Sequence, residues 1–158
     1  MRTTSDFHRM LREASLRVTA PRLAVLRAVH AHPHADTDSI YGVIREDFGV
    51  VVSLQAVYDV LHALTAAGLV RRFEPKGSVA RYESRTGDNH HHVVCRSCGA
   101  IDDVDCAVGT MPCLTPSDDR GFTIDEAEVI YWGQCPGCAA AAAELPRSTA
   151  AAEGEGTQ

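Results

Sequence analysis

Two Cys-x-x-Cys pairs, Cys95/Cys98 and Cys135/Cys138, constrain the fold of this chain more than any other feature of its sequence. Each pair stands among turn-forming residues, in CRSCG and in CPGC, and two such turns can bring four thiolates into tetrahedral geometry around one zinc ion. Because four thiolates fill the coordination of zinc, the predicted site is structural rather than catalytic. Two unrelated thiol pairs or redox-active dithiols are the alternative interpretation.

We expect these thiols to stay reduced, because the sequence predicts a cytoplasmic protein. The N-terminal stretch MRTTSDFHRMLREASLRV is charged and lacks the apolar core of a signal peptide, and no apolar run is long enough to span a bilayer. A disulfide framework is therefore not expected. Cys106 and Cys113 have no Cys-x-x-Cys partner and are interpreted as small buried residues, with a redox role left open.

Charge is divided unevenly along the chain, whose net charge is −6. Residues 1–86 carry 12 Lys/Arg against 9 Asp/Glu, whereas residues 87–158 carry 3 against 12. The basic first half suits a phosphate-bearing partner, and the acidic second half suits cations. The distribution therefore predicts two modules with different partners.

Helical periodicity and a hairpin signal indicate a winged helix-turn-helix in the first half. One helix, SLQAVYDVLHALTAAG, buries Leu54, Val57, Leu61 and Leu64 and leaves Gln55, Tyr58, Asp59 and His62 outward. In such a domain one exposed helix enters the major groove and the wing lies on the DNA backbone. The expected helices cover about residues 5–15, 21–29, 37–48 and 53–67, and the expected wing strands are 69–74 and 79–83.

The second half predicts a small α/β module that follows a polar linker. Its expected strands are 91–95, 100–104 and 122–131, and the low-complexity tail from Ala139 onward is expected to be disordered. The predicted fold class is therefore α+β, with a winged-helix DNA-binding domain over residues 1–84. A dimerisation and metal-binding domain over 85–138 and a tail over 139–158 complete the expected organisation.

A run of three histidines precedes the first cysteine pair. In a strand, His90 and His92 share one face and His91 points the other way. Glu83 ends the preceding strand, and Asp102, Asp103 and Asp105 follow the first cysteine turn. These nitrogen and oxygen ligands suit Fe, Mn, Zn or Ni, and the alternative is a solvated polar loop. The spacing gives His34 no role beyond ending a helix.

The segments LRVTAPR, HADTDSIY, SLQAVYDVL, GLVRRF, HHHVVCRSCG and YWGQCPGC together resemble the ferric uptake regulator (Fur) family, in order over about residues 5–138. Within the family the chain looks most like the FurA-type branch, which is usually associated with catalase-peroxidase genes and oxidative stress. The resemblance implies a winged-helix domain joined by a hinge to an α/β dimerisation domain. Its implied partners are a double-stranded DNA operator and a second copy of the chain, with no membrane and no small-molecule substrate.

The resemblance also assigns roles to particular residues. The four cysteines of the two pairs match the ligands of a structural zinc. The ligands of a regulatory metal between the domains carry over as His34, Glu83, His90, His92 and Asp103. DNA contacts are expected from Arg17, Arg22, Ser53, Gln55 and Tyr58; Tyr58 matches a tyrosine that packs on bases, and Arg17 a basic residue that reaches the minor groove. Asp59 departs from the family, which often has a basic residue or Asn there.

Two acidic ligands bear on the signal that such a protein would read. Iron-sensing members tend to carry Glu at both positions and peroxide-sensing members Asp, whereas this chain has Glu83 and Asp103. We interpret the chain as a repressor that uses Fe(II), or else Mn(II), as corepressor and responds to peroxide, controlling catalase-peroxidase and iron-related genes. A plain iron or zinc uptake regulator is the alternative within the family.

Two further classes of protein fit the sequence less well. A zinc-bound thiol redox switch would make the cysteine pairs the active groups, but it leaves the recognition helix and the wing unexplained. An enzyme is not expected, because no nucleophile–base pair stands beside the histidine cluster.

Overall fold

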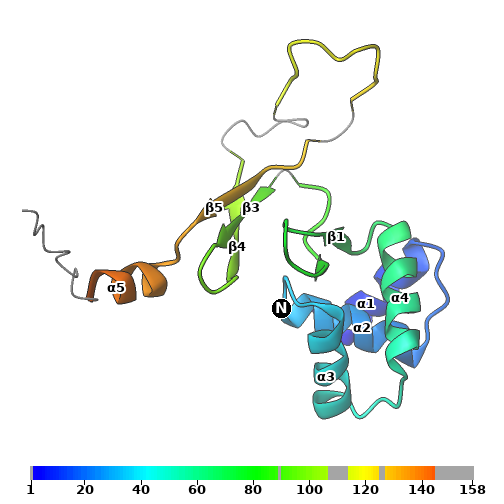
Figure 1. The fold of residues 1–158 in the computed structure, drawn as a ribbon. Helices are drawn as coiled ribbons and strands as arrows, with labels where there is room; N and C mark the ends of the chain where they lie inside the picture. Colours follow the sequence, from blue (N-terminus) through cyan, green and yellow to red (C-terminus); the bar gives the residue numbers. More distant parts are fainter. Residues whose placement is uncertain (1, 89, 107–113, 125–126, 145–158) are drawn as a thin grey trace, which may run out of the picture.

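The computed structural model describes residues 2–88, 90–106, 114–124 and 127–144. Four helices and a two-stranded sheet form an N-terminal unit, and a three-stranded sheet and a last helix follow it (Figure 1). The helices are α1 (Thr4–Glu13), α2 (Ala20–Ala31), α3 (Thr37–Asp47), α4 (Leu54–Ala66) and α5 (Pro136–Glu144). The strands are β1 (Arg71–Phe73), β2 (Arg81–Glu83), β3 (His90–Cys95), β4 (Ile101–Asp105) and β5 (Ile130–Gly133).

A polar residue caps the start of each of the first four helices. The caps are Thr3, Thr19, Asp36 and Ser53, and each side chain accepts a hydrogen bond from a backbone N–H in the first turn. Such caps satisfy backbone donors that have no partner within the helix, each contributing about 0.5–2 kcal/mol. The sequence therefore sets the helix starts locally, before any tertiary contact is made.

The hydrophobic core of the N-terminal unit forms around one face of α4. Val57, Leu61 and Leu64 are fully buried there, at helical spacing, and they pack with side chains from the other three helices. The opposite face of α4 stays in solvent, with Tyr58 45% exposed. Three of the four residues of the predicted stripe are therefore buried, whereas Leu54, in the first turn, is half-buried; the predicted exposed face is confirmed.

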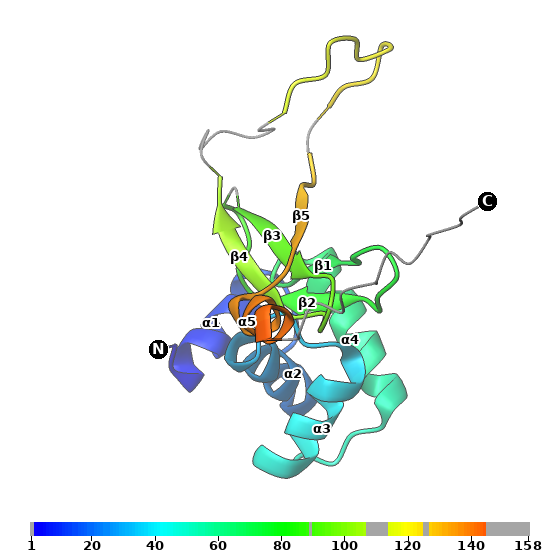
Figure 2. The ribbon, with the colours of Figure 1, turned by 60° about the vertical axis from the view of Figure 1, so that its left-hand side comes forward.

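The second sheet has the strand order β4-β3-β5, with β3 antiparallel to β4 and parallel to β5. In this arrangement β4 ends and β5 begins at the same end of the sheet. Residues 114–124, yellow in Figures 1 and 2, project away from the rest of the molecule on that side. The other end of the sheet brings together the ends of β3 and β5, which carry the cysteine pairs.

Two expectations for the second half are wrong. The last strand covers Ile130–Gly133 instead of 122–131, and its parallel pairing with β3 begins with Ile130 opposite His92. Part of the tail expected to be disordered is helical, since α5 extends to Glu144. Its alanines have the highest helix propensity of any residue, and Pro136 stands in the first turn, where proline is favoured. Residues 145–158 lie outside the described residues.

None of the helices in the described part of the chain has the length and the apolar composition that spanning a bilayer requires.

Replacing Leu61 by alanine should destabilise the N-terminal unit. The side chain is fully buried on α4, and a leucine-to-alanine change in a packed core typically costs about 2–5 kcal/mol through lost burial and the cavity left behind. Chemical denaturation of the zinc-loaded protein would measure this change. His62→Ala, an exposed position on the same helix, is the control and should stay within about 0.5 kcal/mol of wild type. Equal stabilities of the two variants would contradict the assigned core.

Candidate metal centres

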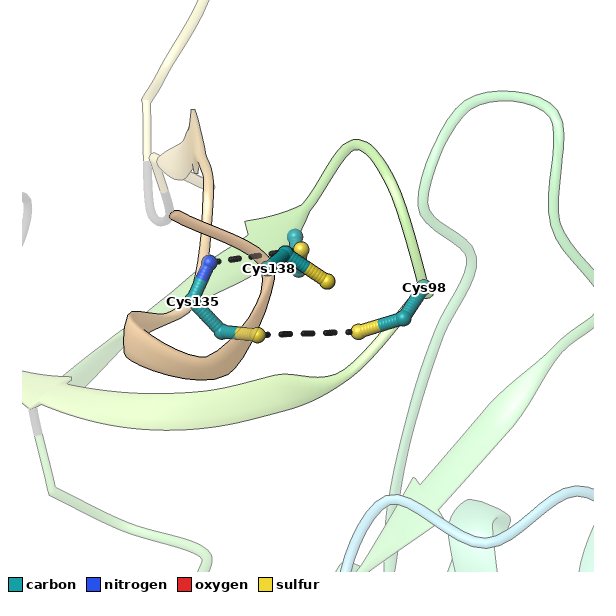
Figure 3. A group of neighbouring side chains, drawn as sticks. Cys98, Cys135 and Cys138 are labelled. Atoms are coloured by element: carbon teal, nitrogen blue, oxygen red, sulfur yellow. Dashed lines mark hydrogen bonds between the residues drawn. The ribbon is translucent and has the colours of Figure 1, made fainter. Parts of the chain in front are cut away.

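The four cysteines of the two pairs converge at one end of the second sheet. Cys95 ends β3, and the parallel pairing of Cys95 with Gly133 on β5 places the second pair beside the first. The four Sγ atoms all lie within 4.8 Å of one another. The Sγ atoms of Cys98 and Cys135 are 3.7 Å apart (Figure 3). Tetrahedral zinc with bonds of about 2.3 Å separates its sulfurs by about 3.8 Å, so the cluster fits a structural zinc.

The charges at this cluster also favour a cation. Backbone N–H groups of Cys135, Cys98 and Ser97 donate to the Cys95 sulfur and lower the pKa of its thiol to about 6. Hydrogen bonding with the other three sulfurs raises the pKa of Cys138 to about 12. The negative charges of four thiolates so close together would repel one another. All four can be deprotonated only beside a strong positive charge.

A second cluster of donor atoms lies between the N-terminal unit and the second sheet. It contains His34, Glu83, His92 and Asp103, with one donor atom of each within 4.8 Å of the others. Nε2 of His34 lies 2.7 Å from Oδ1 of Asp103 and 3.4 Å from Oε2 of Glu83. Nε2 of His92 lies 3.2 Å from Oε2 of Glu83 and 3.7 Å from Oδ1 of Asp103.

Local backbone contacts place His34 beside Glu83. The loop after α2 is tied to β2, because the N–H of His34 donates to the carbonyl of Tyr82 and the N–H of Tyr82 donates to the carbonyl of Ala35. His34 takes a left-handed conformation, with φ of 64°, that non-glycine residues rarely adopt. The role that spacing alone did not give His34, and that the resemblance implied, thus has a geometric counterpart.

His90 lies at the edge of this second cluster. It shares a face of β3 with His92, and its Nε2 is 3.1 Å from Oε1 of Glu83 and 3.9 Å from Oδ1 of Asp103. His91 lies on the opposite face of β3, where its ring is 6.1 Å from that of Tyr131. Of the five predicted ligands, the structure brings four into one tight group and places the fifth next to it.

Burial and close contact shift the pKa values of the second cluster. Burial alone would raise the pKa of Glu83, but hydrogen bonds with His34 and His92 lower it far below the ordinary range. Burial opposes protonation of His34, yet hydrogen bonds to Glu83 and Asp103 raise the pKa of its imidazole. Imidazole and carboxylate donors at these separations match the roughly 3–3.6 Å between ligands that share an ion at about 2.0–2.2 Å. The cluster therefore fits a divalent metal.

Two residues beside the metal ligands were not identified from the sequence. The ring of Phe73, on β1, stacks on that of His92 at 3.8 Å and 8°, and it meets the ring of His34 edge-on at 5.9 Å. Asp88 lies 2.8 Å from Nδ1 of His90. The sequence around Phe73 carries no signal for this ring contact, whereas the position of Asp88 just before the histidines is a usable signal.

The residues predicted to contact DNA lie at two places: Ser53, Gln55 and Tyr58 at the start of α4, and Arg17 and Arg22 just before α2 and in its first turn. Ser53 caps α4 and is exposed, as are Gln55 and Tyr58. Arg17 is exposed before α2, and the Nη1 of Arg22 donates to its carbonyl at 2.8 Å. The guanidinium of Arg22 thus holds the turn that carries Arg17.

The exposed face of α4 carries an internal hydrogen bond. The side-chain amide of Gln55 donates to Asp59 at 2.9 Å, one helical turn further on. The residue that departs from the family pattern therefore positions a predicted DNA-contacting side chain.

Of the two remaining cysteines, the structure describes Cys106, which is not part of the group of four. Cys106 follows β4 and is half-buried, and Cys113 lies outside the described residues.

Comparison with known proteins matches residues 13–131 of the chain to the ferric uptake regulator family. The transcriptional regulator FurA of Mycobacterium tuberculosis is 69% identical over 139 residues, which are 87% of this chain and 93% of that protein. Ferric uptake regulation protein 2 of Mycolicibacterium fortuitum is 67% identical over 144 residues, which are 89% of this chain and 98% of that protein.

Solved structures show the same fold. The ferric uptake regulator of Vibrio cholerae has a TM-score of 0.61 and 25% identity, and the match covers 81% of this chain and 98% of that one. The regulator of Pseudomonas aeruginosa, solved with manganese, has a TM-score of 0.60 and 26% identity, with 82% and 98% covered.

Cys135→Ser should release the structural zinc. Losing one of four thiolates removes most of the apparent stabilisation of about 10–16 kcal/mol that such a site contributes in small zinc-binding peptides. We expect zinc per chain, measured by atomic absorption, to fall to a small fraction of the wild-type value, and the melting temperature to fall with it. Cys106→Ser is the control, because its sulfur is outside the cluster, and it should retain the zinc. Full zinc content in Cys135→Ser would refute the assignment.

Affinity at the second cluster should fall as the pH is lowered. A metal ion binds the unprotonated imidazole, and the raised pKa of His34 keeps its proton in place to a higher pH than in free histidine. In zinc-loaded protein, Co(II) titrations should show steadily weaker binding from about pH 8 to about pH 6. His62→Asn, far from the cluster on α4, should reproduce the wild-type profile. A pH-independent affinity would show that no imidazole of this cluster binds the ion.

Proposed function

Since the chain belongs to the ferric uptake regulator family, we propose that it is a homodimeric, metal-dependent repressor that binds operator DNA. In this proposal the cysteine cluster holds structural zinc, and His34, Glu83, His92 and Asp103, with His90 beside them, hold a regulatory Fe(II) or Mn(II). The protein is not an enzyme, and since its target is DNA it works in the cytoplasm. Its relatives are named as regulators, which supports this function.

The observation that carries the proposal is the dual origin of the metal donors. His34 and Glu83 belong to the N-terminal unit, whereas His92 and Asp103 belong to strands of the second sheet. A divalent ion supplies the positive charge that holds both pairs of donors together. The donors meet in one relative orientation of the two halves, so the ion binds that orientation more tightly than any other. Such a difference in affinity is what a corepressor requires.

The wing is in direct contact with the same cluster. Phe73 lies on β1, the first strand of the wing hairpin, and its ring packs against those of His34 and His92. Any change in the position of the His92 ring therefore shifts Phe73 and the wing strand that carries it. This contact gives the metal site a short route to a part of the molecule that would lie on DNA.

The DNA-binding surface that we propose is the exposed face of α4 together with the wing and the segment before α2. It presents Tyr58, Gln55, Ser53 and Arg17, in the half of the chain that carries the excess of Lys and Arg. Tyr58 offers an apolar ring to bases, and Arg17 offers a charge to phosphates or the minor groove. The acidic second half would face away from the phosphates.

Dimerisation is supported by the composition of the second sheet. Among the described residues after Glu83, only Val94 and Cys95 are buried hydrophobic residues, whereas Val104 and Tyr131 are 36% and 50% exposed. A sheet with so small a core needs another apolar surface to cover it. We propose that a second copy does so, which would also present two DNA-binding units to two half-sites.

We further propose that the repressor responds to peroxide and controls catalase-peroxidase and iron-related genes. The support is the similarity to FurA-type proteins and the presence of imidazole donors whose oxidation would remove a ligand. A plain iron or zinc regulator is the second candidate, because one of the two acidic ligands is Glu83. A thiol switch is disfavoured, since all four paired cysteines converge on the zinc-like cluster.

Operator binding should depend on the regulatory metal and, with iron, on the absence of peroxide. Under anaerobic conditions, we expect Fe(II) or Mn(II) to raise the affinity of zinc-loaded protein for a catalase-peroxidase promoter fragment by about 5–150-fold. Fluorescence anisotropy would measure this affinity. A peroxide pulse should abolish binding with Fe(II) and spare it with Mn(II). His34→Ala should bind DNA weakly with either metal, because one of the donors that join the halves is missing.

Tyr58→Ala separates DNA contact from metal sensing. It should lose DNA affinity while binding Co(II) as wild type does, because the side chain is exposed on α4 away from the donors. Equal DNA binding by the wild-type protein with and without added metal would contradict the corepressor model. Binding that survives peroxide in the Fe(II) form would favour the plain metal regulator, and loss accompanied by zinc release would favour the thiol switch.

A further inference from the structure

Arg85 lies in the segment between β2 and β3, and its guanidinium contacts three carboxylates. Its Nε is 2.5 Å from Oδ2 of Asp88, its Nη1 is 3.3 Å from Oδ2 of Asp103, and its Nη2 is 2.6 Å from Oδ1 of Asp105. Each of the three nitrogens therefore has its own acceptor. Arg85 is not a metal donor, so the metal site as described leaves this arrangement unexplained.

The carboxylate of Asp103 is divided between Arg85 and the metal cluster. Its Oδ2 accepts from Arg85, whereas its Oδ1 is 2.7 Å from Nε2 of His34 and 3.7 Å from Nε2 of His92. The contact with Arg85 turns Oδ2 away from the donors, and it favours binding of a metal through Oδ1 alone. A two-oxygen carboxylate ligand is typical of sites for hard, oxygen-seeking cations such as Ca²⁺, so this restriction bears on which ion the site accepts.

The carboxylate of Asp88 is divided in the same way. Its Oδ2 accepts from Arg85, and its Oδ1 is 2.8 Å from Nδ1 of His90. A proton on Nδ1, donated to Asp88, leaves the lone pair of His90 on Nε2, which faces the carboxylate of Glu83. Carboxylates behind a histidine fix its tautomer and ring orientation in just this manner at metal sites.

The stability that these ion pairs contribute is too small to account for them. The side chains of Arg85, Asp88 and Asp105 are 39%, 42% and 84% exposed, and ion pairs so exposed typically contribute about 0–1 kcal/mol. Groups that orient metal ligands have a larger effect, since their loss typically lowers metal affinity by about 10–100-fold. The effect of Arg85 should therefore be measured at the metal site and not in the stability of the fold.

We propose that Arg85 is a positioning residue of the regulatory metal site. Its planar fork fixes Asp103 as a one-oxygen ligand and, through Asp88, fixes the tautomer and direction of His90. The inference rests on the proposed function, since it requires a metal at this cluster. Lysine cannot replace arginine in this role, because an ammonium is a single point of charge and does not hold three acceptors in fixed directions.

The test compares Arg85→Lys and Arg85→Gln with Arg120→Gln in the full-length, zinc-loaded protein. Arg120 is the matched control, because it forms an exposed ion pair with Asp118 in the projecting segment 114–124. Co(II) is the probe; its affinity comes from competition with a chelator, and its visible absorption spectrum reports the ligand geometry. Both Arg85 variants should bind Co(II) about 10–100-fold more weakly and with an altered spectrum. Zinc content and the melting temperature without Co(II) should match wild type, as should every property of Arg120→Gln.

Each other result overturns the inference. If Arg85→Lys keeps the wild-type affinity and spectrum while Arg85→Gln loses them, charge alone acts. If both variants behave as wild type, or if Arg85→Gln binds Co(II) more tightly with an unchanged spectrum, Arg85 does not position the ligands. If wild type itself binds no Co(II) beyond the zinc site, the proposed function fails as well, which distinguishes that failure from a failure of Arg85 alone.

Discussion

One buried carboxylate, that of Glu83, lies at the centre of the contacts that join the two halves of this molecule. Glu83 is fully buried at the end of β2, and both of its oxygens face imidazoles of His34, His90 and His92. A buried charge is costly unless it is paired, and two of its three partners lie on β3, in the other half. Separating the halves would leave Glu83 with one imidazole, so the closed arrangement and the occupied metal site stabilise each other.

The second sheet has a different basis for its stability. It has two buried hydrophobic residues among those described, too few for an independent core, and the cysteine cluster links the ends of β3 and β5 where that core is missing. A metal centre and an oligomer interface are the usual means by which so small a unit becomes stable. Because four thiolates fill the coordination of zinc, this cluster keeps the second sheet rigid. The exchangeable metal of the other cluster then binds donors on a fixed sheet.

Sequence reasoning was most successful where the determinants are local. The buried stripe on α4, at Val57, Leu61 and Leu64, and the spacing of the cysteines are each specified within a few residues, and the structure contains them. It was weakest for features that depend on long-range pairing: β5 begins at Ile130, where it pairs with β3, and the stacking of Phe73 on His92 joins residues from two sheets. Arg85 was predictable only as part of a polar linker, since its role depends on strand β4 passing beside that linker.

The strained backbone of His34 is maintained by contacts within the N-terminal unit. A non-glycine residue in the left-handed region costs about 1–3 kcal/mol and persists only where the surrounding structure enforces it. Here the hydrogen bonds of the His34 loop to β2 do so, and they lie wholly within the N-terminal unit. His34 and Glu83 are therefore held together without help from the second sheet. In the proposed mechanism, metal binding then has little ordering to do within the N-terminal unit, and its free energy acts on the orientation of one half against the other.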